Sequence, residues 1–183
     1  MFRYIISFLV ILIVFYLNMR EDSFDSKYIE LGMSIPKTGI MEGWGDAVYS
    51  GANAYFLHAK ESNLLNDREI QLIVYDDKYE PELTIENVHK LIKKNVFAFF
   101  AFVGTPTVKR VLPVISKTDI PLIAPFTGAS FLRGKNVENI VNFRSSYAQE
   151  INNAVEYLYN KKNISNFAVF YQNDDYGKEG FVS

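Results

Sequence analysis

The chain alternates between short apolar runs and longer segments in which apolar residues recur every three or four positions. The short runs are typical of buried strands, and the three-to-four spacing is typical of helices with one apolar face. The runs predict strands at residues 28–35, 69–75, 97–103, 121–124, 140–143 and 167–171. The spaced segments predict helices at residues 46–62, 82–94, 107–117 and 146–161. This alternation predicts an α/β fold with a doubly wound parallel sheet.

Two of these helices show the pattern most clearly. Asp46 is a suitable N-cap for the helix expected at 46–62. The expected inward stripe of that helix comprises Val48, Ala52, Tyr55, Phe56 and Ala59. The expected inward stripe of the helix at 82–94 comprises Ile85, Val88, Leu91 and Ile92.

Residues 96–132 form the unit around which the other elements are organised. A strand, a helix and a second strand in this order imply parallel pairing, so the loops after both strands reach one edge of the sheet. Those loops contain Gly104, Thr105, Pro106 and Thr107, and Pro125, Phe126, Thr127, Gly128 and Ala129. Open parallel sheets bind ligands at this edge, which favours a small-molecule site, although the same residue types also build ordinary loops.

The N-terminus resembles a signal peptide. Arg3 precedes an apolar run of about fourteen residues, which as a helix is roughly 21 Å long. That length is short of the ~30 Å hydrocarbon core of a bilayer and favours export over a permanent span. Residues 18–20 offer no small-x-small cleavage site. An uncleaved membrane anchor is therefore the alternative.

Composition excludes several functional classes. The 183 residues are 49% hydrophobic, which is enough for a core. The net charge of −2 provides no basic surface for nucleic acid. The chain has no cysteine, which excludes disulfides, zinc–thiolate sites and thiol nucleophiles.

Few side chains suggest catalysis or metal binding. Asp76 and Asp77 follow a predicted strand with no His nearby, and we interpret them as a solvated turn. His58 and His89 lack the spacing of metal ligands. Residues 128–136 fail the phosphate-loop spacing, and the sequence contains neither G-x-S-x-G nor G-x-G-x-x-G. We therefore expect no catalytic residue, no metal and no cofactor.

The last forty residues repeat the pattern and then stop. The run at 167–171 predicts a further buried strand, and Gly177 and Gly180 lie where a helix begins. A strand without partners is prone to aggregation, so we expect that further residues normally follow Ser183.

Six motifs spread from about Ile29 to Gly180 carry a resemblance. They are TGIMEGWGDAVYSGANAYF, LIVYDDKYEPELTIENVHKLI, VGTPTV, IPLIAPFTGASFLR, VNFRSSYAQE and AVFYQNDDYGKEG. In this order and spacing they resemble the N-terminal half of the leucine/isoleucine/valine-binding family of periplasmic solute-binding proteins. These proteins are extracytoplasmic receptors of branched-chain amino-acid ABC importers. The resemblance implies the type I periplasmic binding fold, whose two Rossmann-like lobes close on a ligand by a hinge.

The resemblance also implies ligand-binding residues in both loops. Thr105 and Thr107 match the family's loop that meets the α-carboxylate and α-ammonium groups of an amino acid. Thr127 and Ala129 match the second loop with that role. Hydroxyl and N–H groups suit a zwitterion because they bury no unpaired charge.

Two aromatic residues complete the implied site. Trp44 stands where the family often has an aromatic residue beside the ligand, although a lone Trp also commonly packs in a core. Tyr176 matches an aromatic ring that the second lobe swings over the cleft.

Family members are longer than this chain. The N-terminal pattern predicts a signal peptide or anchor at 1–18 and a linker at 19–26. The resemblance implies an incomplete first lobe at 27–142 and the start of a truncated second lobe at 143–183. The loop PFTGA differs from that of amino-acid-specific members and leaves the identity of the ligand open.

We expect a periplasmic solute-binding receptor, not an enzyme. Its ligand is a branched-chain amino acid or a related small amide or carboxylate, and its partner is the membrane permease of an ABC transporter. The alternative is a ligand-sensing domain of a signalling receptor with the same fold. An enzyme of flavodoxin-like or hydrolase type is less favoured because no cofactor loop or nucleophile is present.

Overall fold

The computed structural model describes residues 27–134 and 137–182. The signal peptide or anchor expected at 1–18 and the linker expected at 19–26 lie outside the described residues. Within the described part of the chain, no helix combines the length and the apolar character needed to cross a membrane.

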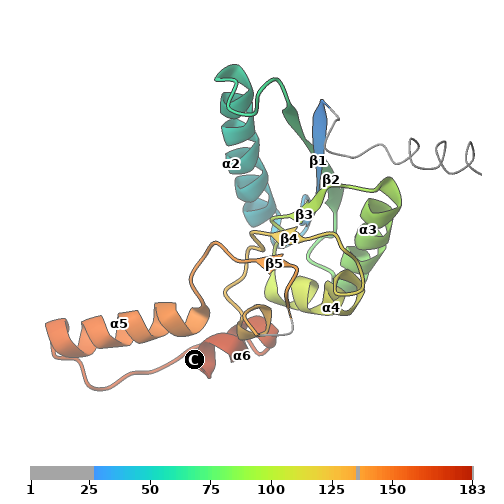
Figure 1. The fold of residues 1–183 in the computed structure, drawn as a ribbon. Coiled ribbons are helices and arrows are strands. Elements are labelled where there is room, and N and C mark those ends of the chain that lie inside the picture. The colour runs from blue at the N-terminus through green and yellow to red at the C-terminus, as the bar shows by residue number, and fades with distance from the viewer. Residues whose placement is uncertain (1–26, 135–136, 183) are drawn as a thin grey trace, which may run out of the picture.

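The described strands form one parallel sheet in the order β2-β1-β3-β4-β5 (Figure 1). They are β1 (Tyr28–Ile35), β2 (Glu69–Asp76), β3 (Ala98–Phe100), β4 (Leu122–Ile123) and β5 (Ile140–Val141). β1 pairs with β2 along its whole length, and β3 pairs with β1 on one side and with β4 on the other. Since β2 lies on one side of β1 and all later strands lie on the other, the predicted doubly wound parallel sheet is confirmed.

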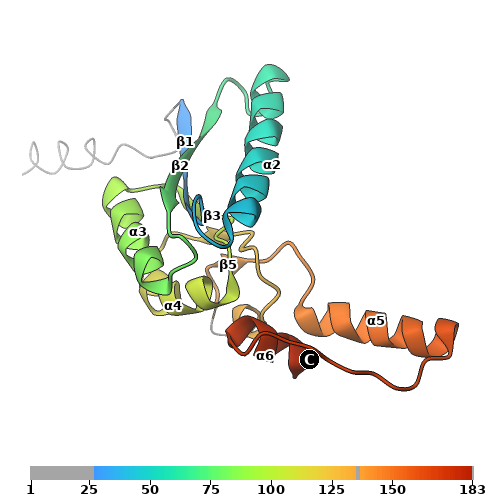
Figure 2. The same ribbon diagram turned by 180° about the vertical axis from the view of Figure 1, so that it is seen from behind.

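Helices cover both faces of the sheet (Figures 1 and 2). Helix α2 (Glu42–Glu61) lies on one face, while α3 (Pro81–Lys94) and α4 (Thr105–Ile115) pack against each other on the opposite face. Helix α3 begins with Pro81, whose missing N–H has no partner in a first turn anyway. It ends at Lys94, and the following Asn95 adopts the left-handed conformation common after helices.

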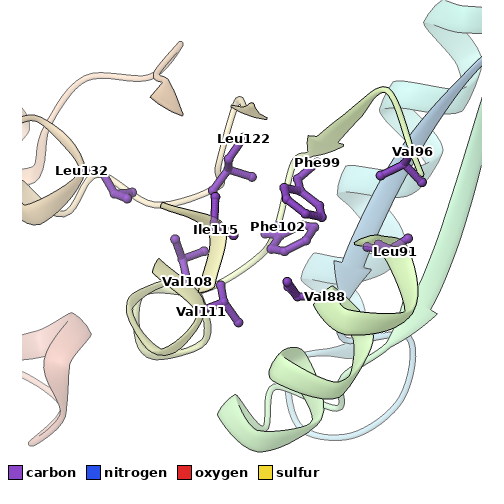
Figure 3. Packing of buried hydrophobic residues seen from close by; sticks show 10 residues of the cluster. All are labelled: Val88, Leu91, Val96, Phe99, Phe102, Val108, Val111, Ile115, Leu122 and Leu132. Atoms are coloured by element: carbon purple, nitrogen blue, oxygen red, sulfur yellow. The ribbon is translucent and has the colours of Figure 1, made fainter. Parts of the chain in front are cut away.

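The larger hydrophobic core lies between the sheet and helices α3 and α4 (Figure 3). The rings of Phe99 and Phe102 lie at its centre, with their centroids 5.6 Å apart. Other fully buried members are Val88, Leu91, Val108, Val111, Ile115 and Leu122. A Cβ at Gly32 of β1 would lie 2.7 Å from Leu91 Cδ2, so the glycine lets α3 approach the sheet closely.

A smaller core lies between the other face and helix α2. Met33 and Ile35 of β1 are fully buried there, with Val48 and Tyr49 of α2 packed against this cluster. Successive strand residues point to opposite faces, so Ser34 points away from α2 toward α3. The two cores bury both faces of β1, as expected for a central strand of a parallel sheet.

Helix α2 begins earlier than predicted, at Glu42 instead of Asp46. Asp46 is therefore not the N-cap, and its carboxylate instead accepts a hydrogen bond from Lys37 Nζ. The glycines before it had suggested a loop, but Gly45 lies inside the helix, where a Cβ would clash with the Pro36 carbonyl oxygen at 1.9 Å. The inward position predicted for Tyr55 is also wrong, because its side chain is 61% exposed.

Strands β3 and β4 are shorter than their apolar runs because each ends in a kink. Ala101 follows β3 with a φ of 50°, and Ala124 follows β4 with a φ of 54°. This left-handed conformation is unusual for alanine and interrupts a strand. Beyond the kinks, Val103 and Phe126 form one further parallel bridge, so the two following loops stay side by side.

The chain from residue 143 onward packs less. Helices α5 (Tyr147–Lys162) and α6 (Asp175–Phe181) confirm the helix predicted at 146–161 and the helix start predicted near Gly177. The strand predicted at 167–171 is wrong, because these residues are exposed and lie in an irregular segment between the two helices (Figure 2). A strand needs a neighbour for its N–H and C=O groups, and none of the described strands pairs with this one.

Candidate ligand-binding cleft

A cavity of about 910 Å³ lies at the carboxyl edge of the sheet. Loops after β1, β2, β3 and β4 form one side of it, and α5, α6 and the segment between these helices form the other. Most of its large side chains are aromatic, namely Trp44, Tyr79, Phe126, Tyr147, Phe170, Tyr171, Tyr176 and Phe181. The cavity occupies the place where open parallel sheets bind ligands.

Three buried hydroxyl groups join the two predicted loops beside this cavity. Thr105 Oγ1 lies 2.7 Å from Thr127 Oγ1, and each of these atoms lies 3.2 Å from the Tyr147 hydroxyl. Each hydroxyl can donate one hydrogen bond and accept others, so the three can bond in a closed ring. Reorienting one O–H would offer a neutral donor to a ligand at Thr105, which lines the cavity.

Tyr147 reaches these threonines because the start of α5 is fixed in two ways. Ser146 caps the helix by accepting a hydrogen bond from the Gln149 N–H at 3.1 Å, and Gln149 Oε1 accepts one from the Ser146 N–H at 2.9 Å. The Tyr147 N–H also donates to the Gly128 carbonyl at 2.9 Å. A Cβ at Gly128 would lie 2.7 Å from the Tyr147 ring, so the glycine makes room for it.

Trp44 lies in the first turn of α2, at the mouth of the cavity. Its ring is tilted against the ring of Phe126, with the centroids 5.5 Å apart, and its side chain is 53% exposed. This exposure argues against the core-packing alternative. A half-exposed indole beside a cavity has apolar surface that a ligand can cover.

Tyr176 approaches the cavity from α6. Its ring meets the ring of Tyr147 edge-on, with centroids 5.5 Å apart. Helix α6 is tied to the first part of the chain by Lys109 Nζ, which donates to Asp175 at 2.8 Å. It is tied a second time by the Ser130 N–H and hydroxyl, which donate to Glu179 at 2.9 and 3.1 Å.

One ion pair lies in the lining. Arg144 donates to Glu150 Oε1 at 2.6 Å, and its guanidinium lies over the rings of Phe126 and Tyr147 at 5.5 and 5.3 Å. The hydrogen bond from Arg144 lowers the pKa of the Glu150 carboxyl, so this group is ionised at neutral pH. The pair therefore brings no net charge to the cavity.

Three of the predicted site residues, Thr107, Thr127 and Ala129, are buried and lie behind the lining. Thr107 is fully buried, and its single O–H proton is shared between the carbonyl oxygens of Val103 and Gly104, which lie 2.6 and 3.0 Å from Oγ1. Ala129 is also fully buried, and its N–H donates to Thr127 Oγ1 at 3.3 Å. These residues hold the loops in shape from below, whereas Trp44, Thr105 and Tyr176 line the cavity itself.

The solvated turn predicted for the two aspartates is wrong for Asp77. Its side chain is fully buried and accepts hydrogen bonds from Ser34 Oγ at 2.8 Å and from the Tyr79 N–H at 3.0 Å. Burial raises the pKa of this carboxyl to about 6. Burial also acts to raise the pKa of Asp76, but hydrogen bonds from Thr38 and from backbone N–H groups outweigh it and lower that pKa.

Sequence patterns missed several lining residues, chiefly Tyr79, Tyr147 and Arg144. Tyr147 had a usable signal, because the capping-box spacing of Ser146 and Gln149 marks the start of a helix directly after a strand. Tyr79 had none, since its position depends on how the loops after β2 and β3 meet.

The chemistry of the cleft favours binding. Among the described residues that line it there is no His, Lys or Asp, and its Glu is engaged by Arg144. The described residues also contain no group of three or more His, Cys, Asp or Glu side chains that could hold a metal ion. Hydroxyls without an adjacent base are weak nucleophiles.

A family model described as "Periplasmic binding protein" matches residues 28–182. The Leu/Ile/Val-binding protein homolog 3 of Brucella melitensis is 21% identical over 150 residues, which are 82% of this chain and 41% of that protein.

Two solved structures are similar over nearly the whole described chain. A possible leucine/isoleucine/valine-binding protein from Rhodopirellula baltica is 38% identical with a TM-score of 0.80, over 86% of this chain and 43% of that one. A substrate-binding periplasmic protein from Ralstonia solanacearum is 29% identical with a TM-score of 0.77, over 84% and 44%. This chain thus spans less than half the length of the relatives that it matches.

Proposed function

The chain belongs to the periplasmic binding protein family, and we propose that it is the solute-binding receptor of an ABC importer. The observation that carries this proposal is the meeting of Thr105, Thr127 and Tyr147 beneath a cavity lined with aromatic rings. Neutral hydroxyls at the bottom and apolar rings around them suit a small solute with one polar end and one apolar end. The cleft then binds and releases this solute unchanged.

The proposed ligand is a branched-chain amino acid or a related small amide or carboxylate. Its polar end lies at Thr105, where a hydroxyl that turns out of the hydrogen-bonded ring donates to a carboxylate or amide oxygen. Its apolar end lies against Trp44 and Tyr176, whose rings exclude water. Thr107, Thr127 and Ala129 support this contact by fixing the two loops.

The proposal divides the chain into a first lobe at 27–142 and the beginning of a second lobe at 143–183. The cavity lies between these two parts, and α6 rests on the first lobe through the contacts of Asp175 and Glu179. Hinge closure of two lobes around a ligand is the known motion of periplasmic binding proteins. A ligand that touches Thr105 on one side and Tyr176 on the other stabilises the closed arrangement.

The same proposal places the protein outside the cytoplasm and gives it a membrane permease as its partner. Export requires the N-terminal segment 1–18 to act as a signal peptide or an anchor. Delivery requires that the permease recognise the closed receptor and accept its solute.

Isothermal titration calorimetry tests the proposal. The 183-residue chain is titrated with L-leucine, L-valine, benzoate and octanoate, and the recovered solute is checked by NMR. We expect saturable binding of at least one of these solutes and its recovery without chemical change. No binding of any of them would contradict the proposed ligand class, and a converted solute would contradict the receptor function.

A further inference from the structure

Tyr79 enters the cleft from a third loop, which follows β2. Lys78 and Tyr79 both have left-handed backbones, with φ of 54° and 68°. Two successive non-glycine residues in this conformation are uncommon and persist only where surrounding contacts hold them. The tyrosine side chain is half-buried and lines the cavity.

Asp77 is one of the residues that hold this turn. Its Oδ1 accepts a hydrogen bond from the Tyr79 N–H at 3.0 Å, and its carbonyl oxygen accepts one from the Glu80 N–H at 2.7 Å. The carboxylate is fixed in turn by Ser34 of β1 and by Thr84 of α3. The turn is therefore anchored to the sheet and to a helix.

Gly104 is the second residue on which the position of Tyr79 depends. Its φ is 111°, which a residue with a Cβ rarely adopts. A Cβ at this position would lie 2.4 Å from Cε2 of Tyr79, so the ring occupies the space that a side chain would need. Gly104 immediately precedes Thr105, and the ring of Tyr79 thus lies next to the proposed polar end of the ligand site.

We propose that Tyr79 is a specificity-determining residue of the cleft, and that Asp77 and Gly104 are its positioning residues. This inference rests on the proposed function, since it assigns a role in selecting the bound solute. A ring that packs against Gly104 and whose backbone is fixed by Asp77 acts as a rigid wall, whereas a freely rotating ring would move aside for a larger ligand. The wall limits the size of solutes that reach Thr105.

The phenol of Tyr79 adds a polar element to this wall. Burial raises its pKa to about 12, with the nearby Asp174, Tyr147 and Tyr176 acting in the same direction. The hydroxyl is therefore neutral at physiological pH and can both donate and accept a hydrogen bond.

Selectivity measurements test the role of the ring. Calorimetry compares the affinities for L-leucine and L-phenylalanine, or for benzoate and 2-naphthoate, in the wild type, Tyr79→Ala and the exposed control Tyr55→Ala. We expect Tyr79→Ala to shift the affinity ratio toward the larger solute by about tenfold or more. The control should change the ratio by less than about twofold. Equal changes for both solutes in Tyr79→Ala would overturn the specificity role.

The positioning role of Asp77 has its own readout. Asp77→Ala removes the acceptor of the Tyr79 N–H and should reproduce the shift in selectivity, whereas Asp77→Asn keeps an acceptor oxygen and should largely restore the wild-type ratio. An Asp77→Ala variant that binds both solutes with the wild-type ratio would remove Asp77 from this role.

A double-mutant cycle without ligand tests the contact with Gly104. Gly104→Ala is compared in the wild type and in Tyr79→Ala by urea unfolding. If the Tyr79 ring fills the space of the missing Cβ, Gly104→Ala should lower the folding equilibrium constant less in Tyr79→Ala than in the wild type. We expect the reduction to be about tenfold smaller in the variant that lacks the ring. Independent effects would overturn the positioning claim for Gly104. A wild type that binds no solute would instead contradict the proposed function together with the specificity role. The double-mutant cycle would then still test whether the Tyr79 ring packs against Gly104.

Discussion

Residues 97–103 and residues 167–171 are equally apolar, but they differ in burial and in secondary structure. Phe99 in the first stretch is fully buried, whereas Phe170 in the second is 103% exposed relative to a reference residue. The first stretch contains β3, a central strand of the sheet, and the second lies in an irregular segment. Their sequences alone do not distinguish them.

The difference lies in their neighbours. β3 has β1 on one side and β4 on the other, so its backbone groups and both faces find partners. No described strand adjoins residues 167–171, and the same kind of sequence therefore forms no strand. An apolar segment can form a strand, but it does so only where a neighbouring strand pairs with its backbone groups.

The largest expected difference between the two parts concerns these phenylalanines. We expect Phe99→Ala to lower the free energy of unfolding by about 3–5 kcal/mol, because it opens a cavity between the sheet and helices α3 and α4. We expect Phe170→Ala to change it by less than about 0.5 kcal/mol. Urea unfolding followed by circular dichroism measures both.

Phe99→Leu provides a milder companion in case Phe99→Ala does not fold. It should retain part of the packing and lie between the wild type and Phe99→Ala. Equal effects of substitutions at 99 and 170 would show that the second stretch is packed in solution.

A second prediction concerns how the stability of residues 27–142 depends on pH. The pKa of Asp77 is raised by burial to about 6 in the folded chain, above its ordinary value of 3.8. Between these values the folded state holds a proton that the unfolded state releases, so stability falls as the pH rises from about 4 to about 6. The expected loss is roughly 2–3 kcal/mol, which Asp77→Asn should abolish.

Urea unfolding of both proteins across this pH range checks the sign. The lowered pKa of Asp76 acts in the opposite direction, and its contribution is lost only as the pH falls below its ordinary value of 3.8. A wild-type profile parallel to that of Asp77→Asn would mean that Asp77 is not buried.

A third prediction concerns the N-terminal cap of α5, in the chain from residue 143 onward. Ser146→Ala removes the cap of α5, and we expect a loss of about 1 kcal/mol in local helix stability. Since α5 is largely exposed, this loss should appear as faster amide exchange in α5 and not in α3. Ser116→Ala, at the exposed C-terminal end of α4, is the matched control and should leave both rates unchanged.

The smallest expected effect concerns the ion pair that joins the two parts. Lys109 and Asp175 are both substantially exposed, so their coupling energy should be at most about 0.5 kcal/mol and should fall with salt. A cycle of Lys109→Ala and Asp175→Asn measures it. A coupling well above 1 kcal/mol would show that α6 is held more firmly than this exposure implies.

Most of the fold of residues 27–142 could be predicted from their sequence. The spacing of Val88 and Leu91 placed α3, and the alternation of strand and helix predicted parallel pairing, which brought Thr105 and Thr127 together. The buried position of Asp77 could not be predicted, because it depends on Ser34, which is 43 residues away along the chain.

The remaining parts of the cleft depend on contacts between loops. The fit of Tyr79 against Gly104 leaves no pattern in the spacing of residues. For Tyr147 the capping box marks the start of the helix, but not the fit of the ring against Gly128. The first turn of α2 was missed because its glycines resemble a loop, although close packing against Pro36 requires one of them.

We propose that a small solute binds between Thr105 and Trp44, and tryptophan fluorescence can test this location. Trp44 is the only tryptophan of the sequence, so its emission reports on the mouth of the cleft. A solute that binds in calorimetry should change this emission with the same saturation curve, and Thr105→Val should weaken its binding by about 1–3 kcal/mol. Saturable binding that leaves both the Trp44 emission and the affinity of Thr105→Val unchanged would place the ligand elsewhere and contradict the account.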